Sequence, residues 1–433
     1  MSLLIKNAQI VNADKKEKQK QDIFIDRGQI QQIAPSLKVK AGKTIDAEGL
    51  LVLPGLIDIH VHLRTPGQEY KEDLESGSQA AVKGGFTSMM CMPNTRPVID
   101  NAMIVEGILN ESRRLGLCHI VPIGSITRGQ KDQELVDMFD LKKAGCLALS
   151  DDGKSVVNSQ LMRRAIEYAK MVDILLIQHC EDPLISAGGA MNEGVTSTML
   201  GIKPDPYISE SIIVSRDIEL VNFLGGRVHF AHMSCRRSVE LIRQAKKQGI
   251  PVTAEACPHH FALTEDAVRS FDTHTKMNPP LRTADDVEAI KEGLKDGTID
   301  LIVTDHAPHS KEDKEVSFEQ APFGIIGLET SLALTITELV KPGILNWEQV
   351  VDKMSTSQAR IAGMESKGVI AEGYDADITL IDPDLEWEVT PEDTASKSKN
   401  SPFFGTKLTG RVQTTIFGGR VVYQDKLKLV AAR

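Results

Sequence analysis

Eight short apolar segments recur through the middle of this chain, with amphipathic stretches of helical length between most of them. Alternating strands and helices constrain the fold strongly, because parallel strands joined by helices pack in few ways. Four stretches carry apolar residues near i, i+3, i+4 and i+7, the spacing of one helix face: Leu74–Lys83, Gln160–Lys170, Arg237–Gln248 and Asp286–Lys295. The expected strands are Leu56–Ile59, Phe86–Met92, His119–Ile123, Cys146–Leu149, Ile174–Ile177, Arg227–Ala231, Pro251–Ala254 and Leu301–Thr304. The pattern predicts an α/β fold built on a parallel, TIM-like (β/α)₈ barrel.

The two ends of the chain predict β-structure without this alternation. Near the N-terminus, Leu3–Val11 and Asp22–Ile33 alternate or run apolar, and Asp26-Arg27-Gly28 is a candidate hairpin turn. Near the C-terminus the strand candidates are Ala376–Ile381, Gln413–Phe417 and Val421–Tyr423. We expect the two ends to pair into one small β-sandwich domain, formed by residues 1–53 and 365–433, around a barrel at residues 54–364.

Length and charge narrow the class of protein. A chain of 433 residues is long enough for one large domain and a smaller one. A net charge of -10 argues against a nucleic-acid or anionic-membrane surface, because both require a basic field. No apolar run approaches the roughly 20 residues that a membrane helix needs, and the first residues turn polar too soon for a signal peptide. We therefore expect a cytoplasmic protein without nucleic-acid or membrane partners.

Six cysteines are spread along the chain without a CxxC pair. Several lie in apolar runs, which is typical of buried free thiols in a reducing compartment. Cys180 and Cys257 have histidines nearby and are candidates for a catalytic thiol, but packing in the core is the favoured interpretation for both.

Imidazoles and carboxylates follow five of the eight predicted strands. In a (β/α)₈ barrel the active site lies at the carboxyl ends of the strands, so these side chains should converge. His60 and His62 follow the first strand and share one face, because side chains alternate along extended backbone. The other candidates are Asp151 or Asp152 after the fourth strand, His179 after the fifth, His232 after the sixth and Asp305 after the eighth. Only one of the two adjacent aspartates need be a ligand; the other would cap the turn before Gly153.

This set of side chains predicts a metal centre. Four imidazoles and two carboxylates suit zinc, with manganese and cobalt as alternatives. A single tetrahedral catalytic zinc usually takes three protein ligands, so six ligands indicate two ions that share a carboxylate. Two cations roughly 3.5–4 Å apart would acidify a water and polarise a carbonyl oxygen. The chemistry implied is hydrolysis of an amide or lactam.

The remaining histidines are weaker candidates. His119 opens a predicted strand and His229 lies inside one, so both are expected to be packed and hydrogen-bonded. Three others, in predicted loops near the mouth, have either a supporting or a solvated role: His259, His260 and His274. His306 should point away from its neighbour Asp305 on an extended backbone.

Six short motifs along the chain carry a resemblance to a known family. They are Asp58-Ile59-His60-Val61-His62-Leu63-Arg64, Met92-Pro93-Asn94-Thr95, Asn278-Pro279-Pro280-Leu281-Arg282, Thr304-Asp305-His306-Ala307-Pro308-His309, Ala321-Pro322-Phe323-Gly324 and Gly373-Tyr374-Asp375-Ala376-Asp377. In these the chain resembles the amidohydrolase superfamily, and within it the longer bacterial dihydroorotases, over essentially its full length. The last motif is similar to the strand by which the superfamily's chain returns to its β-sandwich.

The resemblance implies roles for the candidate ligands. His60, His62 and Asp305 would hold one zinc ion, and His179 and His232 would hold the second. Many relatives bridge the two ions with a carboxylated lysine. The longer bacterial dihydroorotases use an aspartate there, which favours Asp152 over Asp151, although Lys154 lies two residues beyond.

The resemblance also implies a substrate. Dihydroorotases interconvert N-carbamoyl-L-aspartate and L-dihydroorotate in de novo pyrimidine synthesis, and such a substrate needs a carboxylate clamp beside the metals. Arg64 offers a planar two-donor fork suited to a carboxylate, whereas an ordinary surface ion pair is the weaker interpretation. The full set of implied substrate contacts is His62, Arg64, Asn94, Asn278, His309, Phe323 and Gly324. Asp305 would take the proton from the attacking water and return it to the leaving nitrogen.

Two other interpretations compete with this one. A sister cyclic amidase, such as a dihydropyrimidinase (hydantoinase) or an allantoinase, would not need the carboxylate clamp. A catalytically inactive relative that serves as a scaffold for aspartate transcarbamoylase would have lost metal ligands. An active enzyme is expected to be a homodimer and could also associate with that transcarbamoylase. The polar segment His309–Glu315 is either a loop over the mouth or a solvated face.

Overall fold

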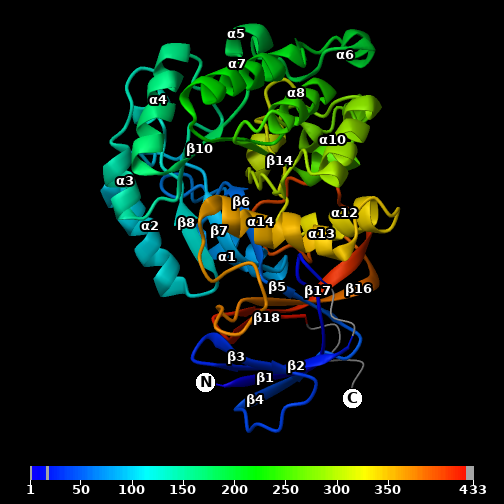
Figure 1. The fold of residues 1–433 in the computed structure, drawn as a ribbon. Coiled ribbons are helices and arrows are strands. Elements are labelled where there is room, and N and C mark those ends of the chain that lie inside the picture. Colours follow the sequence, from blue (N-terminus) through cyan, green and yellow to red (C-terminus); the bar gives the residue numbers. More distant parts are fainter. Residues whose placement is uncertain (1, 16–18, 426–433) are drawn as a thin grey trace.

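The computed structural model describes residues 2–15 and 19–425. Within this part the chain forms a barrel surrounded by helices and a β-rich domain beneath it (Figure 1). The barrel strands are β6 (Leu56–Val61), β7 (Phe86–Cys91), β8 (His119–Pro122), β9 (Ala148–Ser150), β10 (Leu175–Gln178), β13 (Val228–Phe230), β14 (Val252–Ala256) and β15 (Leu301–Ile302). Each lies within about two residues of a strand predicted from the sequence.

The strands close into a ring. In the described part of the chain they form one parallel sheet in the order β6-β7-β8 and another in the order β15-β14-β13-β10-β9. Two isolated parallel bridges join the sheets: Gly124 with Leu149, and Val61 with His306. The predicted parallel (β/α)₈ barrel is confirmed. The eighth strand is shorter than predicted. The amide of Thr304 donates to the carboxylate of Asp58 and therefore makes no hydrogen bond to a neighbouring strand.

Helices follow the strands around the barrel. The four helices predicted from their apolar spacing are confirmed as α1 (Leu74–Lys83), α4 (Ser159–Val172), α8 (Arg236–Lys247) and α10 (Ala284–Asp296). The others are α2 (Ala102–Leu115), α3 (Met138–Ala144), α5 (Pro183–Ser186), α6 (Val195–Leu200), α7 (Ile208–Leu224), α9 (Pro258–Ala262), α11 (Lys311–Lys314), α12 (Ser331–Thr335), α13 (Trp347–Val351) and α14 (Ser357–Ala362). Side chains cap several of them: Asn158 accepts from the second and third amides of α4, which would otherwise lack partners.

Both chain ends contribute to the β-rich domain. In the described residues its strands run in the order β18-β17-β16-β5-β1-β2-β3, with β4 paired to β1. Their bounds are β1 (Leu3–Ile10), β2 (Gln21–Asp26), β3 (Gln29–Ala34), β4 (Lys43–Asp46), β5 (Leu51–Pro54), β16 (Ile378–Glu388), β17 (Lys407–Phe417) and β18 (Arg420–Gln424). Strand β5 pairs antiparallel with β16 and so joins the two ends of the chain. Side chains from both ends share one apolar core, including Ile5, Ile23, Leu380 and Ile416. The predicted β-sandwich of N- and C-terminal segments is confirmed.

Because side chains alternate along a strand, residues two apart point to the same side, and this places candidate ligands at the mouth of the barrel. Ile177 packs inside the barrel, and His179, two residues later, continues on the same side. The same spacing relates Val303 to Asp305. Beyond the strands, His232 and Asp305 adopt left-handed φ values of 37° and 44°. Such backbone is uncommon for residues other than glycine, although histidine and aspartate adopt it more often than most, and strained backbone is concentrated at functional sites.

No helix in the described part of the chain is both long and apolar enough to cross a membrane.

Candidate metal centre and substrate pocket

The side chain of Asp152 lies between two pairs of histidines at the carboxyl ends of the barrel strands. Its Oδ2 is 3.3 Å from Nε2 of His62, and its Oδ1 is 3.4 Å from Nε2 of His60. On the other side, Oδ1 is 3.5 Å from Nδ1 of His179 and 3.5 Å from Nε2 of His232. A carboxylate in contact with both histidine pairs is the arrangement that a bridging ligand needs.

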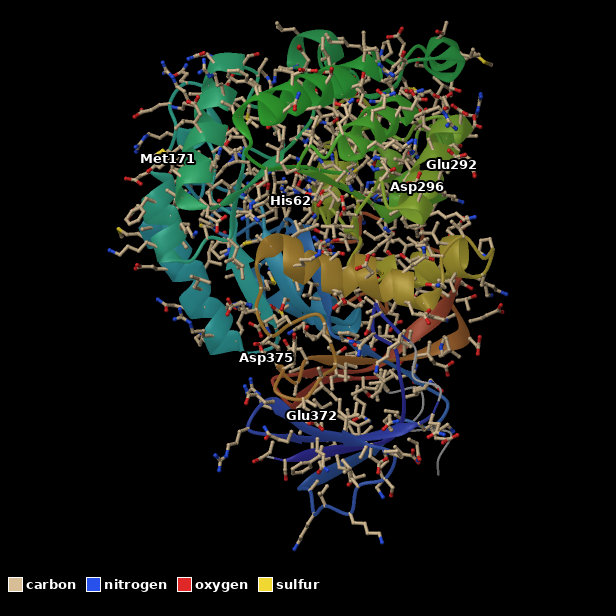
Figure 2. All side chains as sticks on the ribbon, in the orientation of Figure 1. His62, Met171, Glu292, Asp296, Glu372 and Asp375 are labelled. Carbon is tan, nitrogen blue, oxygen red and sulfur yellow. The ribbon has the colours of Figure 1, made fainter. Side chains whose placement is uncertain are left out.

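Asp305 completes this cluster. Its Oδ1 lies 3.1 Å from Nε2 of His62 and 3.5 Å from Nε2 of His60. All six predicted ligands are buried, and Figure 2 shows His62 in the middle of the barrel region, away from Glu372 and Asp375 of the lower domain. Three overlapping triplets have ligand atoms within 4.8 Å of one another: His60, His62 and Asp152; His60, His232 and Asp305; and Asp152, His179 and His232.

The donor atoms of this cluster fit a bound metal. Nε2 of His60 and Oδ1 of Asp152 face each other in the interior, and neither has a hydrogen-bond partner among the described residues. Buried polar atoms are usually paired, so such atoms indicate a missing partner. Burial disfavours charge on His60, but Glu255, Asp152 and Asp305 raise the pKa of its imidazole well above the usual value. The field at this point therefore favours positive charge, and the imidazole and carboxylate donors are those that zinc takes.

Buried carboxylates and amides orient the histidines. Glu255 accepts from Nδ1 of His60 at 2.5 Å and from Nε2 of His229 at 2.9 Å, which leaves Nε2 of His60 directed at the cluster. Burial would raise the pKa of Glu255, but His60 and His229 hold it at about 2, so the carboxylate is ionised. Around the other ligands, Glu181 lies 3.1 Å from Nε2 of His179, and Oδ1 of Asn94 lies 2.8 Å from Nδ1 of His62.

Sequence reasoning missed Glu255 and Glu181. The signal for Glu255 was present, because this charged residue directly follows the predicted strand Pro251–Ala254, the position from which side chains reach the mouth of a barrel. His229 is packed and hydrogen-bonded as predicted, since its Nδ1 also lies 2.7 Å from Oγ1 of Thr253. His119 is half-buried, and its Nδ1 has no hydrogen-bond partner in the described residues.

The structure separates the two adjacent aspartates. The carboxylate of Asp151 accepts from the amides of Ile126 and Thr127 at 2.8 and 3.0 Å, and from the hydroxyl of Thr127. Asp151 thus binds a neighbouring loop, whereas Asp152 faces the histidines. Burial would raise the pKa of Asp152, but His60 and its neighbours hold it well below the usual range.

Replacing each aspartate in turn with asparagine tests this distinction. We expect Asp152→Asn to weaken metal binding by more than about 100-fold, beyond the cost of losing a partner that only orients a ligand. Asp151→Asn is the matched control, because its amide oxygen still accepts from the two backbone amides, and it should retain metal near the wild-type content. Elemental analysis of the purified variants checks this. Equal metal content in the two variants would remove Asp152 from the ligand set.

A cavity of about 270 Å³ opens above the cluster. Every predicted substrate contact lines it: His62, Arg64, Asn94, Asn278, His309, Phe323 and Gly324. Asn278 also donates to Glu181 at 2.8 Å, and Asn94 also contacts His62. Both amides therefore line the cavity and are held in place by hydrogen bonds to other side chains.

Arg64 is a buried cation without an anionic partner. Its Nε donates to the carbonyl of Pro308 at 3.1 Å, and among the described residues no carboxylate oxygen lies within 4.0 Å of its guanidinium. Burial lowers its pKa to about 10, so the group is still protonated at neutral pH. A buried charge is costly unless it is paired. The cavity is therefore prepared for an anion.

His309 lines the cavity, and it contacts Lys71, which pairs with Asp313 at 3.3 Å. Nε2 of His309 lies 2.8 Å from the carbonyl of Phe323 and donates to it, so Nδ1 accepts from Nζ of Lys71 at 3.2 Å. Burial and the nearby cations Arg64 and Lys71 hold the pKa of His309 well below its usual range, so its ring is neutral. The polar segment that follows His309 forms the short helix α11, which Ser310 caps.

The other histidines and cysteines considered from the sequence are neither among the six predicted metal ligands nor among the predicted substrate contacts. His306 points away from the cluster as predicted: its Nδ1 accepts from the amide of Gly327 at 3.2 Å. His274 is half-buried and pairs with Asp272. Cys180 and Cys257 are buried thiols, and burial raises the pKa of both well above the usual value, which argues against a catalytic thiolate.

Comparisons with known proteins agree on one family. The sequence pattern of the amidohydrolase family matches residues 51–422. The chain is 51% identical over 427 residues to a dihydroorotase of Pelotomaculum thermopropionicum, covering 99% of this chain and 100% of that one. It is 49% identical over 425 residues to a dihydroorotase of Pelobacter propionicus, covering 98% and 100%. Among solved structures, an L-hydantoinase (dihydropyrimidinase) from Arthrobacter aurescens superposes with a TM-score of 0.87 at 26% identity, covering 98% of this chain and 96% of the other.

Proposed function

Because the chain belongs to the amidohydrolase family, we propose that it catalyses the dihydroorotase reaction, the reversible closure of N-carbamoyl-L-aspartate to L-dihydroorotate. Relatives about half identical over nearly the whole chain carry that name. One observation in the structure supports the substrate directly: Arg64 is a buried, unpaired guanidinium in the cavity that contains the candidate metal ligands. A substrate carboxylate would supply the charge that this group lacks.

The cavity residues have distinct parts in the proposed reaction. Arg64 holds the ring carboxylate, in the bidentate geometry that a guanidinium favours. Neutral His309 and the amides of Asn94 and Asn278 line the rest of the cavity and supply directional contacts without further charge. Since the substrate is held by groups whose own positions are fixed by hydrogen bonds, its lactam is oriented before the reaction begins.

Asp305 moves the proton. Burial would raise its pKa, but His60 and His62 hold it well below the usual range, so the carboxylate is ionised and able to accept. In the hydrolytic direction a water attacks the lactam carbonyl carbon and gives its proton to Asp305. The carbon–nitrogen bond then breaks, and Asp305 returns the proton to the leaving nitrogen. Ring closure reverses these steps and releases water.

We propose two zinc ions as the cofactor. The six groups that would hold them are His60, His62, Asp152, His179, His232 and Asp305. Ions bound there would supply Lewis acidity to the carbonyl oxygen and lower the pKa of a water. The unpartnered Nε2 of His60 and Oδ1 of Asp152 support this assignment.

The related cyclic amidases are the nearest alternative, because hydantoinases share the fold. Their substrates lack the ring carboxylate, so a hydantoin or dihydrouracil bound here would leave Arg64 buried and unpaired. A site built around a polar group can reject an analogue that lacks its partner by about 10⁴–10⁵-fold. The inactive-scaffold alternative requires lost metal ligands, and all six predicted ligands are present and close together.

Activity of the purified protein tests the proposal. We expect N-carbamoyl-L-aspartate and dihydroorotate to interconvert, and metal analysis to give at least the two ions per chain that this centre would hold. Removing the metal with a chelator should abolish turnover, and added zinc should restore it. A metal-loaded protein without any turnover of either compound would contradict the proposal and favour the scaffold alternative.

Four predictions go with this proposal. The domain limits at residues 53/54 and 364/365 stay a prediction from the sequence. A cytoplasmic location rests on the resemblance and on the six free cysteines, all of them buried. A homodimer and an association with aspartate transcarbamoylase rest on the resemblance alone.

A further inference from the structure

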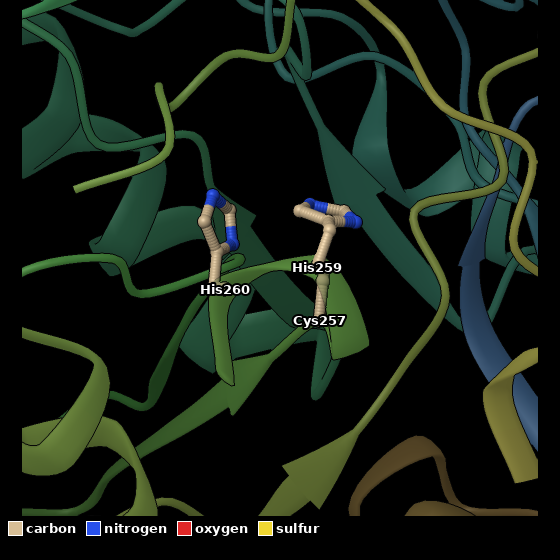
Figure 3. Close-up of side chains that lie close together, drawn as sticks. All are labelled: Cys257, His259 and His260. Carbon is tan, nitrogen blue, oxygen red and sulfur yellow. The ribbon is translucent and has the colours of Figure 1, made fainter. Parts of the chain in front are cut away.

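Three side chains of types that can ligate a metal form a second cluster at the carboxyl end of β14. Cys257 directly follows this strand, and His259 and His260 lie in the first turn of α9 (Figure 3). Each offers one ligand atom, and these atoms lie within 4.8 Å of one another. All three are buried, with exposed fractions of 0%, 2% and 3%. None of them belongs to the six ligands described above.

Two nitrogens in this cluster lack partners. Nε2 of His260 lies 2.9 Å from the carbonyl of Pro279 and donates to it, which leaves Nδ1 with a free lone pair. That Nδ1 and Nε2 of His259 are buried and have no hydrogen-bond partner among the described residues. The two rings are neighbours, with centroids 4.3 Å apart. Ordinary core packing accounts for Cys257, which lies in an apolar cluster, but it leaves both nitrogens unsatisfied.

We propose that Cys257, His259 and His260 form a separate metal site that takes one borderline-soft divalent cation of the zinc type. Thiolate sulfur and neutral imidazole nitrogen are zinc ligands, whereas magnesium and calcium prefer oxygen. Binding exchanges the thiol proton for the cation: the sulfur–hydrogen bond breaks, a sulfur–metal bond forms, and the proton leaves to solvent. Three protein ligands leave one coordination position for a water or another donor.

This site would stabilise the end of a catalytically important strand. Strand β14 also carries Glu255, whose carboxylate orients His60. A cation held by Cys257 and the two histidines would tie the start of α9 to that strand. The site requires no particular substrate, so it stands or falls independently of the proposed function.

Cobalt substitution of the full-length protein tests the proposal. Cysteine-bound Co²⁺ gives a sulfur-to-cobalt charge-transfer band in the near ultraviolet, and the six predicted catalytic ligands contain only nitrogen and oxygen. Metal-free protein titrated with excess Co²⁺ should develop this band, and Cys257→Ser should lack it. Cys118→Ser is the matched control and should retain the band, because Cys118 is also buried and directly precedes a barrel strand, β8.

A second variant separates coordination from misfolding. His260→Gln keeps the thiol and should bind the cobalt that gives the band at least about tenfold more weakly, without loss of the cooperative unfolding transition. Wild-type protein that binds cobalt without any charge-transfer band would overturn the proposal. So would a band of undiminished intensity in Cys257→Ser.

Discussion

Asp305→Asn should lower kcat by about 10³-fold or more while metal content stays near the wild-type value. Loss of a positioned acid–base group typically costs about 10²–10⁴-fold, and here the same group would both accept and return the proton. Asparagine keeps an oxygen 3.1 Å from Nε2 of His62, where Oδ1 of Asp305 lies, so the variant can still contact the cluster. Steady-state kinetics with elemental analysis on the same preparation gives both quantities.

The metal measurement decides how Asp305 acts. A large fall in kcat at full metal content assigns it to proton transfer. A parallel loss of metal and activity would assign it to holding the metal. A kcat within tenfold of wild type at full metal content would contradict any catalytic part for this carboxylate.

Arg64→Met should lower kcat/KM for dihydroorotate by about 10²- to 10⁴-fold. Leaving one charge of a buried pair without its partner costs about 3–5 kcal/mol, and about 1.4 kcal/mol corresponds to a factor of ten. The effect should fall mainly on KM, because Arg64 binds the carboxylate and not the reacting carbonyl. Metal content should be unchanged, since the guanidinium contacts Pro308 and His309 and none of the predicted ligands.

Arg64→Lys is the matched variant for this prediction. It retains the positive charge but loses the planar fork, so it should recover only part of the affinity. Loss of metal together with substrate binding in Arg64→Met would show that Arg64 supports the structure of the loop and does not recognise the substrate.

Much of the barrel could be predicted because its signals are local. Helix α1 matches its predicted limits, since apolar spacing and the capping residue Asp73 act within a few residues. The β-rich domain was harder. Strand β16 runs seven residues beyond its predicted end, to Glu388, although Pro383 interrupts it. Pairing with β17 sustains this strand across a register shift between Asp382 and Glu386, and a proline is tolerated at such an irregularity.

That the six candidate ligands meet was also predictable, because the carboxyl ends of the strands converge on one face of a barrel. The residues alone did not distinguish Asp151 from Asp152, since neighbouring residues differ only in where the backbone directs their side chains; the preference for Asp152 came from the resemblance. The partners of the ligands were hidden for a similar reason. Glu255 and His60 are 195 residues apart, and only the closed ring brings them to 2.5 Å.

The most direct test of the central claim is the ratio of kcat/KM for dihydroorotate to that for dihydrouracil, measured on one metal-analysed preparation with allantoin as a third substrate. The two pyrimidines differ in the ring carboxylate that Arg64 is proposed to bind. The account predicts a ratio above about 10³, as expected when a buried polar group loses its partner, and a much smaller ratio in Arg64→Met. Turnover of dihydrouracil or allantoin without turnover of dihydroorotate would contradict it.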